Sequence, residues 1–255
     1  EGLSLMGELE AIVAGAVRDD SAIASLLENA QSIMAPHDRR EVVDLFSGLG
    51  GMSKGWASVF DSVQGLEKHR TRVNMYNTIN DRAQGMGDAR RCVAQVHNIT
   101  VQHPLPESLV AFTCTILTGG PPCQPFSKQG KQRGAGDERN GIPAFLAAVD
   151  QLRPLVVLME EVENIVLHNT VVGEIVTSLR GWGYYVRLHL SNAIYYGTPQ
   201  YRSRLIIVGS LLGPIDTAPP ISVQEFVTVG TAFEPLNSFA ADSHPELVLS
   251  DDQVA

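Results

Sequence analysis

The chain has 255 residues, of which 44% are hydrophobic and 18% are charged. This balance excludes a disordered or fibrous protein and leaves ample length for one large domain with a buried core. The formal net charge is −9, from 19 Lys and Arg against 28 Asp and Glu residues, which argues against nucleic-acid binding by overall charge alone. No apolar run approaches the roughly 18 residues of a membrane span. Three cysteines without zinc-ligand spacing indicate a reducing, intracellular compartment and no metal site.

Residues 1–36 are predicted to form a helical extension. Apolar side chains recur there at helical spacing in two stretches, separated by a polar break at Arg18–Ser21. We interpret them as helices packed on the main domain rather than as a partner-binding segment, because a helical apolar stripe usually faces a core. The two sets are Leu5, Leu9, Ile12, Val13, Ala16 and Val17, then Ile23, Leu26, Leu27, Ala30, Ile33 and Met34.

From residue 41 onward, short apolar runs alternate with helical stretches. Several runs are continuously apolar, as is typical of strands that are covered on both faces. Helical segments, among them Ile142–Leu152 and Val171–Leu179, fit between most of them. We therefore predict an α/β fold with a doubly wound, mostly parallel, seven-stranded sheet. The predicted strands are Glu41–Phe46, Ser62–Glu67, Ala83–Asp88, Ile116–Gly119, Leu155–Met159, Tyr185–Leu190 and Leu205–Gly209.

Candidate site residues are sought just after these strands, because ligands of such sheets bind at the carboxyl ends of strands. Phe46–Gly51 (FSGLGG) follows the first strand, and its glycines permit a sharp turn and close approach of a ligand. It is not the dinucleotide fingerprint, whose third glycine would fall at Ser53, and alone it equally fits a plain strand-to-helix turn. Glu67 and Asp88 end two further predicted strands, where a carboxylate can bind ribose hydroxyls or simply be a solvated surface group.

A cysteine follows the fourth predicted strand in a rigid loop. In Gly119–Ser127 (GGPPCQPFS), prolines on both sides of Cys123 restrict the backbone. A nucleophilic thiolate needs such a rigid presentation. Cys92 and Cys114 are instead interpreted as small buried residues. The residues next to Cys123 include no histidine, so the local sequence does not indicate a Cys–His protease pair.

Two charged segments complete the candidates. Val156–Asn164 (VVLMEEVEN) carries three glutamates at the end of a buried strand, where a carboxyl group is suited to donating a proton to a substrate. An exposed acidic turn is the alternative. In Gln200–Arg204 (QYRSR), Arg202 and Arg204 share one face of an extended segment and can hold a base carbonyl or a phosphate.

Together, in this order and spacing, these segments resemble the DNA (cytosine-5) methyltransferase family over roughly residues 41–210. The resemblance implies a Rossmann-like methyltransferase domain over residues 37–210 that uses S-adenosylmethionine, releases S-adenosylhomocysteine and acts on double-stranded DNA. The matching segments are Phe46–Gly51 (cofactor binding), Gly119–Ser127 with Pro122, Cys123 and Gln124 (nucleophile loop), Asp137–Gly141 (the helix start after a mobile loop), Arg153–Val162 (the Glu-Asn-Val segment) and Gln200–Arg204 (Gln-x-Arg-x-Arg).

The resemblance also implies a role for each cofactor residue. By position, Phe46 would stack on the adenine, Glu67 would bind the ribose hydroxyls, and Asp88 with Ala89 would meet the adenine edge. The other expected cofactor contacts are Ser47, Gly48, Gly50, Gly51, Met52, Lys68 and Pro122.

The implied reaction begins with addition of the Cys123 thiolate to C6 of cytosine, while Glu160 protonates or hydrogen-bonds N3. C5 then attacks the sulfonium methyl group, and loss of the C5 proton expels the thiol. Arg204, supported by Arg202, would hold the cytosine O2. The base must leave the duplex for this chemistry, and the loop Gly130–Gly141, near Lys128, Lys131 and Arg133, would close over it.

One departure from the family lies beside the expected acid. The family's Glu-Asn-Val is Glu160-Glu161-Val162 here, which removes an amide donor, adds a charge near the thiolate, and predicts weakened catalysis. The alternative register Glu163-Asn164-Ile165 restores Glu-Asn but moves the carboxylate three residues past the strand end. The spacing from Pro154 favours Glu160.

The other departure concerns residues 211–255, which contain five prolines and are interpreted as an irregular tail. The family continues here with a target recognition domain and a final cofactor segment, and neither is recognisable. We therefore expect a catalytic domain that is completed by a second subunit or a further C-terminal segment. The alternatives are a non-catalytic methyltransferase-like interaction subunit and an RNA cytosine-5 methyltransferase of the same fold. The expected location is the cytoplasm of a prokaryote or the nucleus of a eukaryote.

Overall fold

The structure is a computed structural model that describes residues 41–57, 60, 62–84, 91–110, 114–122, 140–215 and 227–232. The predicted N-terminal helices, the loop that carries Cys123 and most of the predicted tail lie outside these residues. Within them, no helix is both long and apolar enough to span a membrane.

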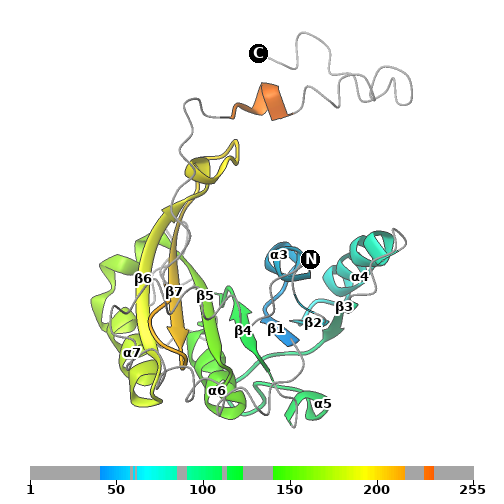
Figure 1. The fold of residues 1–255 in the computed structure, drawn as a ribbon. Coiled ribbons are helices and arrows are strands. Elements are labelled where there is room, and N and C mark those ends of the chain that lie inside the picture. The colour runs from blue at the N-terminus through cyan, green and yellow to red at the C-terminus, as the bar shows by residue number, and fades with distance from the viewer. Residues whose placement is uncertain are drawn as a thin grey trace, which may run out of the picture. The chain divides into compact units, whose positions relative to one another are not determined.

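Strands and helices alternate along the described chain, as the sequence predicts (Figure 1). The elements in order are β1 (Glu41–Leu45), α3 (Gly51–Ala57), β2 (Ser62–Glu67), α4 (Arg70–Gln84), β3 (Arg91–Val96), α5 (Glu107–Val110), β4 (Ile116–Gly119), α6 (Ile142–Leu152), β5 (Val156–Val162), η2 (Glu163–Leu167), α7 (Asn169–Gly181), β6 (Tyr185–Asn192), η3 (Ala193–Tyr196) and β7 (Ser203–Ser210).

The strands form one mixed seven-stranded sheet in the order β3-β2-β1-β4-β5-β7-β6. The pairs β1–β2, β1–β4, β2–β3 and β4–β5 are parallel. β6 and β7 follow one another as a hairpin, in which the Ala193 N–H donates to the Arg202 carbonyl at 3.0 Å. The strand order reverses between β1 and β4, and such a reversal is where α/β sheets bind their ligands.

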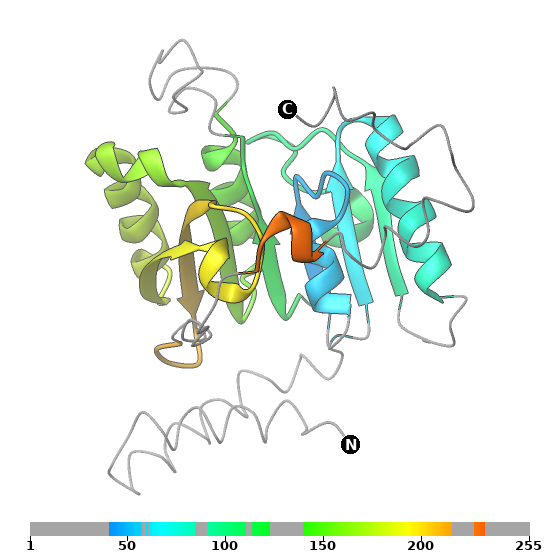
Figure 2. The ribbon, with the colours of Figure 1, turned by 90° about the horizontal axis from the view of Figure 1, so that it is seen from above.

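Two apolar cores lie on opposite faces of the sheet, because successive side chains of a strand point to opposite sides. Val43 of β1 packs in a cluster with Phe145 of α6 and Ile175 of α7. Its neighbour Val42 packs in a second cluster with Val73 of α4. Helices therefore cover both faces, as Figure 2 shows, and the predicted doubly wound architecture is confirmed.

One predicted strand is wrong. Instead of Ala83–Asp88, the third strand is Arg91–Val96, paired with β2 from Ser62–Arg91 to Glu67–Val96. The glycines of residues 83–88 disfavour a strand, and α4 continues through Gln84. Asp88 and Ala89 thus precede the third strand instead of following it. They lie outside the described residues. The prediction that they follow the carboxyl end of the third strand is wrong, because that strand begins only at Arg91.

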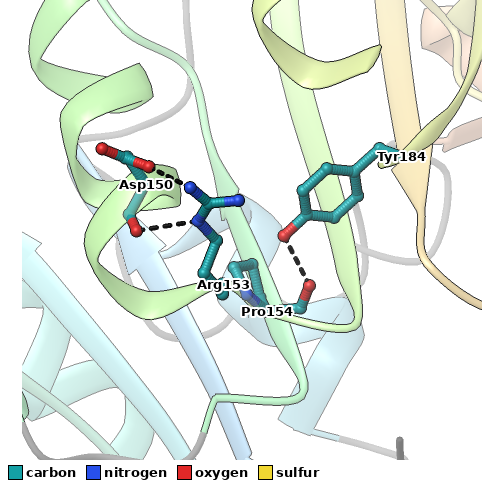
Figure 3. A network of polar contacts seen from close by, with 4 residues as sticks. All are labelled: Asp150, Arg153, Pro154 and Tyr184. Atoms are coloured by element: carbon teal, nitrogen blue, oxygen red, sulfur yellow. Dashed lines mark hydrogen bonds and ion pairs between the residues drawn. The ribbon is translucent and has the colours of Figure 1, made fainter. Parts of the chain in front are cut away.

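The connection between α6 and β5 is fixed by the polar contacts in Figure 3. Arg153 ends α6 with a left-handed φ of 47°, and its guanidinium group pairs with Asp150 and lies 5.2 Å from the centre of the Trp182 ring. The Tyr184 hydroxyl donates to the Pro154 carbonyl at 2.7 Å. These contacts tie the start of β5, the strand that carries Glu160, to the start of β6.

By its internal contacts the chain divides into two units. The first comprises Glu1–His189 with Leu205–Thr217, and the second comprises Leu190–Arg204 with Ala218–Ala255. The expected cofactor residues and Glu160 belong to the first unit, whereas Arg202 and Arg204 belong to the second.

Candidate active site

The segment after β1 is a turn in which three residues have positive φ. These are Phe46 (56°), Gly48 (56°) and Gly50 (88°). For Phe46 the left-handed conformation costs roughly 1–2 kcal/mol, and such strain is concentrated at functional sites. A Cβ atom on Gly48 would meet no described atom within 4 Å. The turn therefore leaves its backbone open to close approach by a ligand.

Glu67, at the end of β2, is held against this turn. Its side chain is buried, with 4% of its surface exposed. Oε2 accepts from the Gly48 N–H at 3.2 Å, Oε1 accepts from the His69 N–H at 2.9 Å, and Arg72 Nη1 lies 3.6 Å from Oε1. Carboxylate oxygens can each accept more than one hydrogen bond. Glu67 is thus fixed in place with capacity left for further donors, as binding of a diol requires.

The other cofactor candidates of this turn lie around the start of α3. Gly51 is its first residue, and Met52 contacts β4, because the Thr118 hydroxyl donates to Met52 Sδ at 3.3 Å. Ser47 is buried, and its Oγ has no hydrogen-bond partner among the described residues. An unpaired buried hydroxyl is unfavourable, so Ser47 is suited to a bond with a bound group. Lys68 is exposed after β2.

The backbone that follows β4 and leads toward Cys123 passes close to the side chain of Glu160. A Cβ atom on Gly120 would lie 3.0 Å from Glu160 Oε2, so a larger residue there would require the Glu160 side chain to shift. Glu160 is partly buried near the end of β5, and Glu161 points to the opposite face, with 1% of its surface exposed. Glu163 is exposed and begins η2. β5 extends through Val162, so Glu160 lies within the strand and Glu163 directly follows it. The assignment of Glu160 as the acid stays a prediction.

The segment between residues 122 and 141 begins and ends at one point of the site. The Gly141 N–H donates to the Pro122 carbonyl at 2.8 Å. A Cβ atom on Gly141 would lie 2.5 Å from Pro122 Cδ and 3.2 Å from Phe46 Cζ. Both ends of this segment are thus anchored beside the turn after β1. Cys123, Lys128, Lys131 and Arg133 lie outside the described residues.

Sequence reasoning missed the residues that follow the true third strand. The His97 N–H donates to the Glu67 carbonyl at 3.0 Å, and the exposed Asn98 comes next. The alternation of Cys92 and Ala94, both buried toward the second core, was the signal that could have placed the strand correctly. His97 and Asn98 therefore occupy the position that was expected for Asp88.

The two cysteines of the described chain are buried, as predicted. Burial raises the pKa of Cys114 to about 12 and also raises the pKa of Cys92. Neither is suited to form a thiolate near neutral pH. Among the described residues, no group of three or more His, Cys, Asp or Glu side chains could hold a metal ion.

In the second unit, Arg202 and Arg204 lie at the β6–β7 hairpin. Asn192 Oδ1 accepts from the Ile194 N–H at 3.2 Å and from the Arg202 N–H at 3.1 Å, and its Nδ2 donates to Ser203 Oγ at 2.9 Å. Arg204 Nη1 donates to the Ser203 carbonyl at 2.7 Å. One buried amide thus fixes the backbone that carries both arginines.

Comparison with known proteins extends this description. The family model for C-5 cytosine-specific DNA methylase matches residues 40–238. The chain is 32% identical to Type II methyltransferase M.AplI of Arthrospira platensis, over 66% of this chain and 44% of that protein. It is 37% identical to M1.HphI of Haemophilus parahaemolyticus, over 74% of this chain and 51% of that protein. With M.AquIA of Picosynechococcus it shares 30% identity, over 68% of this chain and 73% of that protein.

Solved structures agree on the fold. A structure described as a DNA modification methyltransferase encoded within an E. coli prophage has a TM-score of 0.59 and 25% identity, over 76% of this chain and 54% of that chain. A DNMT2 structure from Spodoptera frugiperda has a TM-score of 0.52 and 21% identity, over 74% and 54%. The chain spans about half the length of most of these proteins. From the family model and the curated relatives, the chain belongs to the C-5 cytosine-specific DNA methylase family.

Proposed function

We propose that this protein transfers a methyl group from S-adenosylmethionine to C5 of cytosine in double-stranded DNA. The observation that carries the proposal is the convergence of three features at the ends of β1, β4 and β5. They are the open turn held by Glu67, the bond between Pro122 and Gly141 at the two ends of the segment that contains Cys123, and Glu160 beside Gly120. Methyl transfer to cytosine needs a cofactor site, a nucleophile and an acid at one place.

The residues of the turn fit the cofactor. Phe46 offers a ring for the adenine, Glu67 accepts from the ribose hydroxyls, and the unpaired Ser47 Oγ is available for a further hydrogen bond. We assign the adenine edge to His97 and Asn98, because these residues, and not Asp88 and Ala89, follow β3. When bound, S-adenosylmethionine supplies a methyl group carried on a positively charged sulfur.

The chain's own residues act on the cytosine. The Cys123 thiolate forms a bond to C6, and Glu160 holds a proton at N3, so electron density increases at C5. After the methyl group is in place, loss of the C5 proton breaks the bond between C6 and the Cys123 sulfur and releases the thiolate. Arg204, with Arg202, holds the cytosine O2 through its fixed guanidinium donors.

The complete protein needs more than these residues for base-specific recognition. The chain matches only 44% of M.AplI and 51% of M1.HphI. We infer that the residues corresponding to the remainder of such relatives, in the same polypeptide or in a second subunit, select the DNA sequence. The curated relatives M.AplI, M1.HphI and M.AquIA come from bacteria, so we place the reaction in the bacterial cytoplasm.

The first experiment traps the reaction on the enzyme. The chain is incubated with S-adenosylmethionine and a mixed-sequence duplex containing 5-fluorocytosine, and its intact mass is measured. Fluorine at C5 cannot leave as a proton does, so a working site stays covalently attached to DNA through Cys123. Cys123→Ser should give no adduct and no turnover, while its affinity for S-adenosylhomocysteine stays nearly unchanged.

Controls separate the possible failures. The same sequence as RNA tests the choice of nucleic acid, and omission of S-adenosylmethionine tests dependence on the methyl donor. An adduct that persists in Cys123→Ser would show that the assigned nucleophile is wrong. If the wild type binds S-adenosylhomocysteine but forms no adduct with DNA, catalysis by this chain alone is contradicted.

A further inference from the structure

One face of the sheet carries apolar side chains on β5 and β7 that belong to neither core cluster. Alternate side chains of these two strands pack in the first cluster, namely Val157, Met159, Leu205 and Ile207. Their neighbours Leu158, Ile206 and Val208 therefore point to the opposite face. The second cluster lies on that face, but it is built with α3 and α4 and reaches only to Val156 of β5. Among the described helices, none contributes to a core with Leu158, Ile206 and Val208.

The two faces differ in burial accordingly. On the first face, Val157 and Ile207 are fully buried. On the opposite face, Leu158 and Ile206 are only partly buried. Helices normally cover both faces of a sheet that is largely parallel, and an element that covered this face would bury further apolar surface.

A histidine on the same face has a polar atom without a partner. Val186 of β6 packs against the first cluster, so His189, three residues later on the strand, points to the opposite face. Its Nε2 is buried and has no hydrogen-bond partner among the described residues. A buried polar atom of this kind is unfavourable unless it is paired. The covering element is therefore expected to bring a polar group to His189 in addition to an apolar surface.

The segment that precedes β1 has the sequence of such an element. Six apolar side chains recur at helical spacing between Ile23 and Met34, and Pro36 follows as a helix stop. These residues lie outside the described part of the chain. A helix over these twelve residues is roughly 18 Å long. This length is sufficient to cross β5 and β7, because neighbouring strands are about 4.8 Å apart.

The connection from this segment to the sheet has a suitable length. Only Ala35–Arg40 separate it from Glu41, the first residue of β1. The sheet order places β7 three strands from β1, beyond β4 and β5, which corresponds to roughly 14 Å. Six extended residues span up to about 20 Å. The segment can therefore reach the face without any change in the sheet.

The charges of the segment and the face are complementary. Arg187 is exposed on β6 and, two residues before His189, shares its face. Residues 1–36 are acidic, with Glu1, Glu8, Glu10, Asp19, Asp20 and Glu28 against Arg18 alone. Opposite charges at the rim of an apolar contact favour the correct partner over others.

We propose that residues 21–34 form a helix that docks on the sheet face made by Leu158, Ile206 and Val208, with its apolar side toward these residues. The helix completes the second covering layer of the sheet, over the strand that carries Glu160. The segment before β1 is then a structural part of the methyltransferase domain and not an arm for a partner protein.

The first test is photo-cross-linking in the whole chain. The photoreactive residue p-benzoylphenylalanine replaces Leu27, on the apolar side of the proposed helix, and cross-linked peptides are identified by mass spectrometry after irradiation. The expected cross-links join position 27 to residues 156–162 or 203–210 of the same chain. Ser32 lies on the opposite side of the helix, so the same reagent at position 32 is the matched control and should give none of these cross-links.

The second test uses the reactivity of His189 toward diethyl pyrocarbonate, which modifies accessible imidazole rings. Leu27→Asp places a charge in the proposed contact and should raise the reactivity of His189 several-fold, while the exposed His103 reacts as in the wild type. Ser25→Asp adds the same charge on the polar side of the helix and should leave His189 at the wild-type level. Thermal unfolding checks that both variants fold.

The proposal has clear contrary outcomes. Cross-links from position 27 to α6 or α7 would overturn it, as would an absence of cross-links in the folded chain. Cross-links that form only between two chains would assign the face to a second copy and contradict docking within one chain. Equal reactivity of His189 in Leu27→Asp and Ser25→Asp would also contradict it.

Discussion

At the scale of single residues, the unusual group of the site is Glu161. It replaces the asparagine that the family resemblance leads one to expect, and its side chain is buried on the face of β5 opposite Glu160. Its Oε2 accepts from the Val162 N–H at 3.3 Å. Glutamate has one more methylene group than asparagine, and its carboxylate cannot donate a hydrogen bond and carries charge. The substitution therefore changes both the packing and the electrostatics at this buried position.

Glu161→Asn should preserve or raise the methylation rate. The amide restores a hydrogen-bond donor and removes a negative charge that the family resemblance would place near the Cys123 thiolate, where such a charge is unfavourable. The rate constant of methyl transfer is the measurement, and Glu163→Asn, at an exposed position of η2, is the control and should leave it unchanged. A collapse of activity in Glu161→Asn would mean that this carboxylate has a function of its own.

At the scale of elements, the β6–β7 hairpin depends on the side chain of Asn192. Its oxygen accepts two backbone N–H groups and its nitrogen donates to Ser203. These bonds set the conformation on both sides of η3, so the placement of Arg202 and Arg204 is decided by a residue ten positions before the first of them.

Asn192→Ala should weaken methylation through the arginines while leaving the cofactor site unchanged. Removing the amide leaves two backbone N–H groups without their acceptor, a loss of roughly 1–3 kcal/mol for a buried group. We expect a higher KM for DNA and unchanged affinity for S-adenosylhomocysteine, measured by initial rates and calorimetry. Asn192→Asp, which keeps the two accepted bonds, should retain more activity. A variant with an unchanged KM would contradict the assigned role of Asn192.

At the scale of the whole molecule, the part of the sheet that carries Glu160 is stabilised by a hydrogen bond between two loops, one that leads into β5 and one that leads into β6. Tyr184, at the start of β6, donates to Pro154, at the start of β5. Burial raises the pKa of the Tyr184 hydroxyl, so it stays a neutral donor across the physiological range. Tyr184 and Pro154 are 30 residues apart in the sequence, and their hydrogen bond joins the two ends of the intervening segment.

Tyr184→Phe should lower the free energy of unfolding by about 1–2 kcal/mol, because the buried Pro154 carbonyl loses its donor. Urea denaturation measures this change. The adjacent Tyr185 is 53% exposed, so Tyr185→Phe is a matched control that should leave stability nearly unchanged. Equal effects of the two substitutions would contradict the importance of the buried hydrogen bond.

Much of the fold was predictable because local pattern and tertiary environment agree. Ser62–Glu67, Ile116–Gly119 and Ile142–Leu152 match the observed elements residue for residue, since apolar runs between turn residues define their ends. The third strand was misplaced because Arg91–Val96 holds only a short, weakly apolar alternation. Its pairing with β2, which no local pattern encodes, decided its position.

The sequence by itself determined the order of strands and helices, the family resemblance, and the identities of Phe46, Glu67, Cys123 and Glu160 as candidates, because these depend on local spacing along the chain. Only the tertiary structure decided which groups meet. It joined Glu67 to Gly48, Gly120 to Glu160 and Pro122 to Gly141, and it buried Asp44 beside Ser53. Burial and neighbouring charges arise from segments far apart in sequence, and these set the ionisation of a carboxyl group.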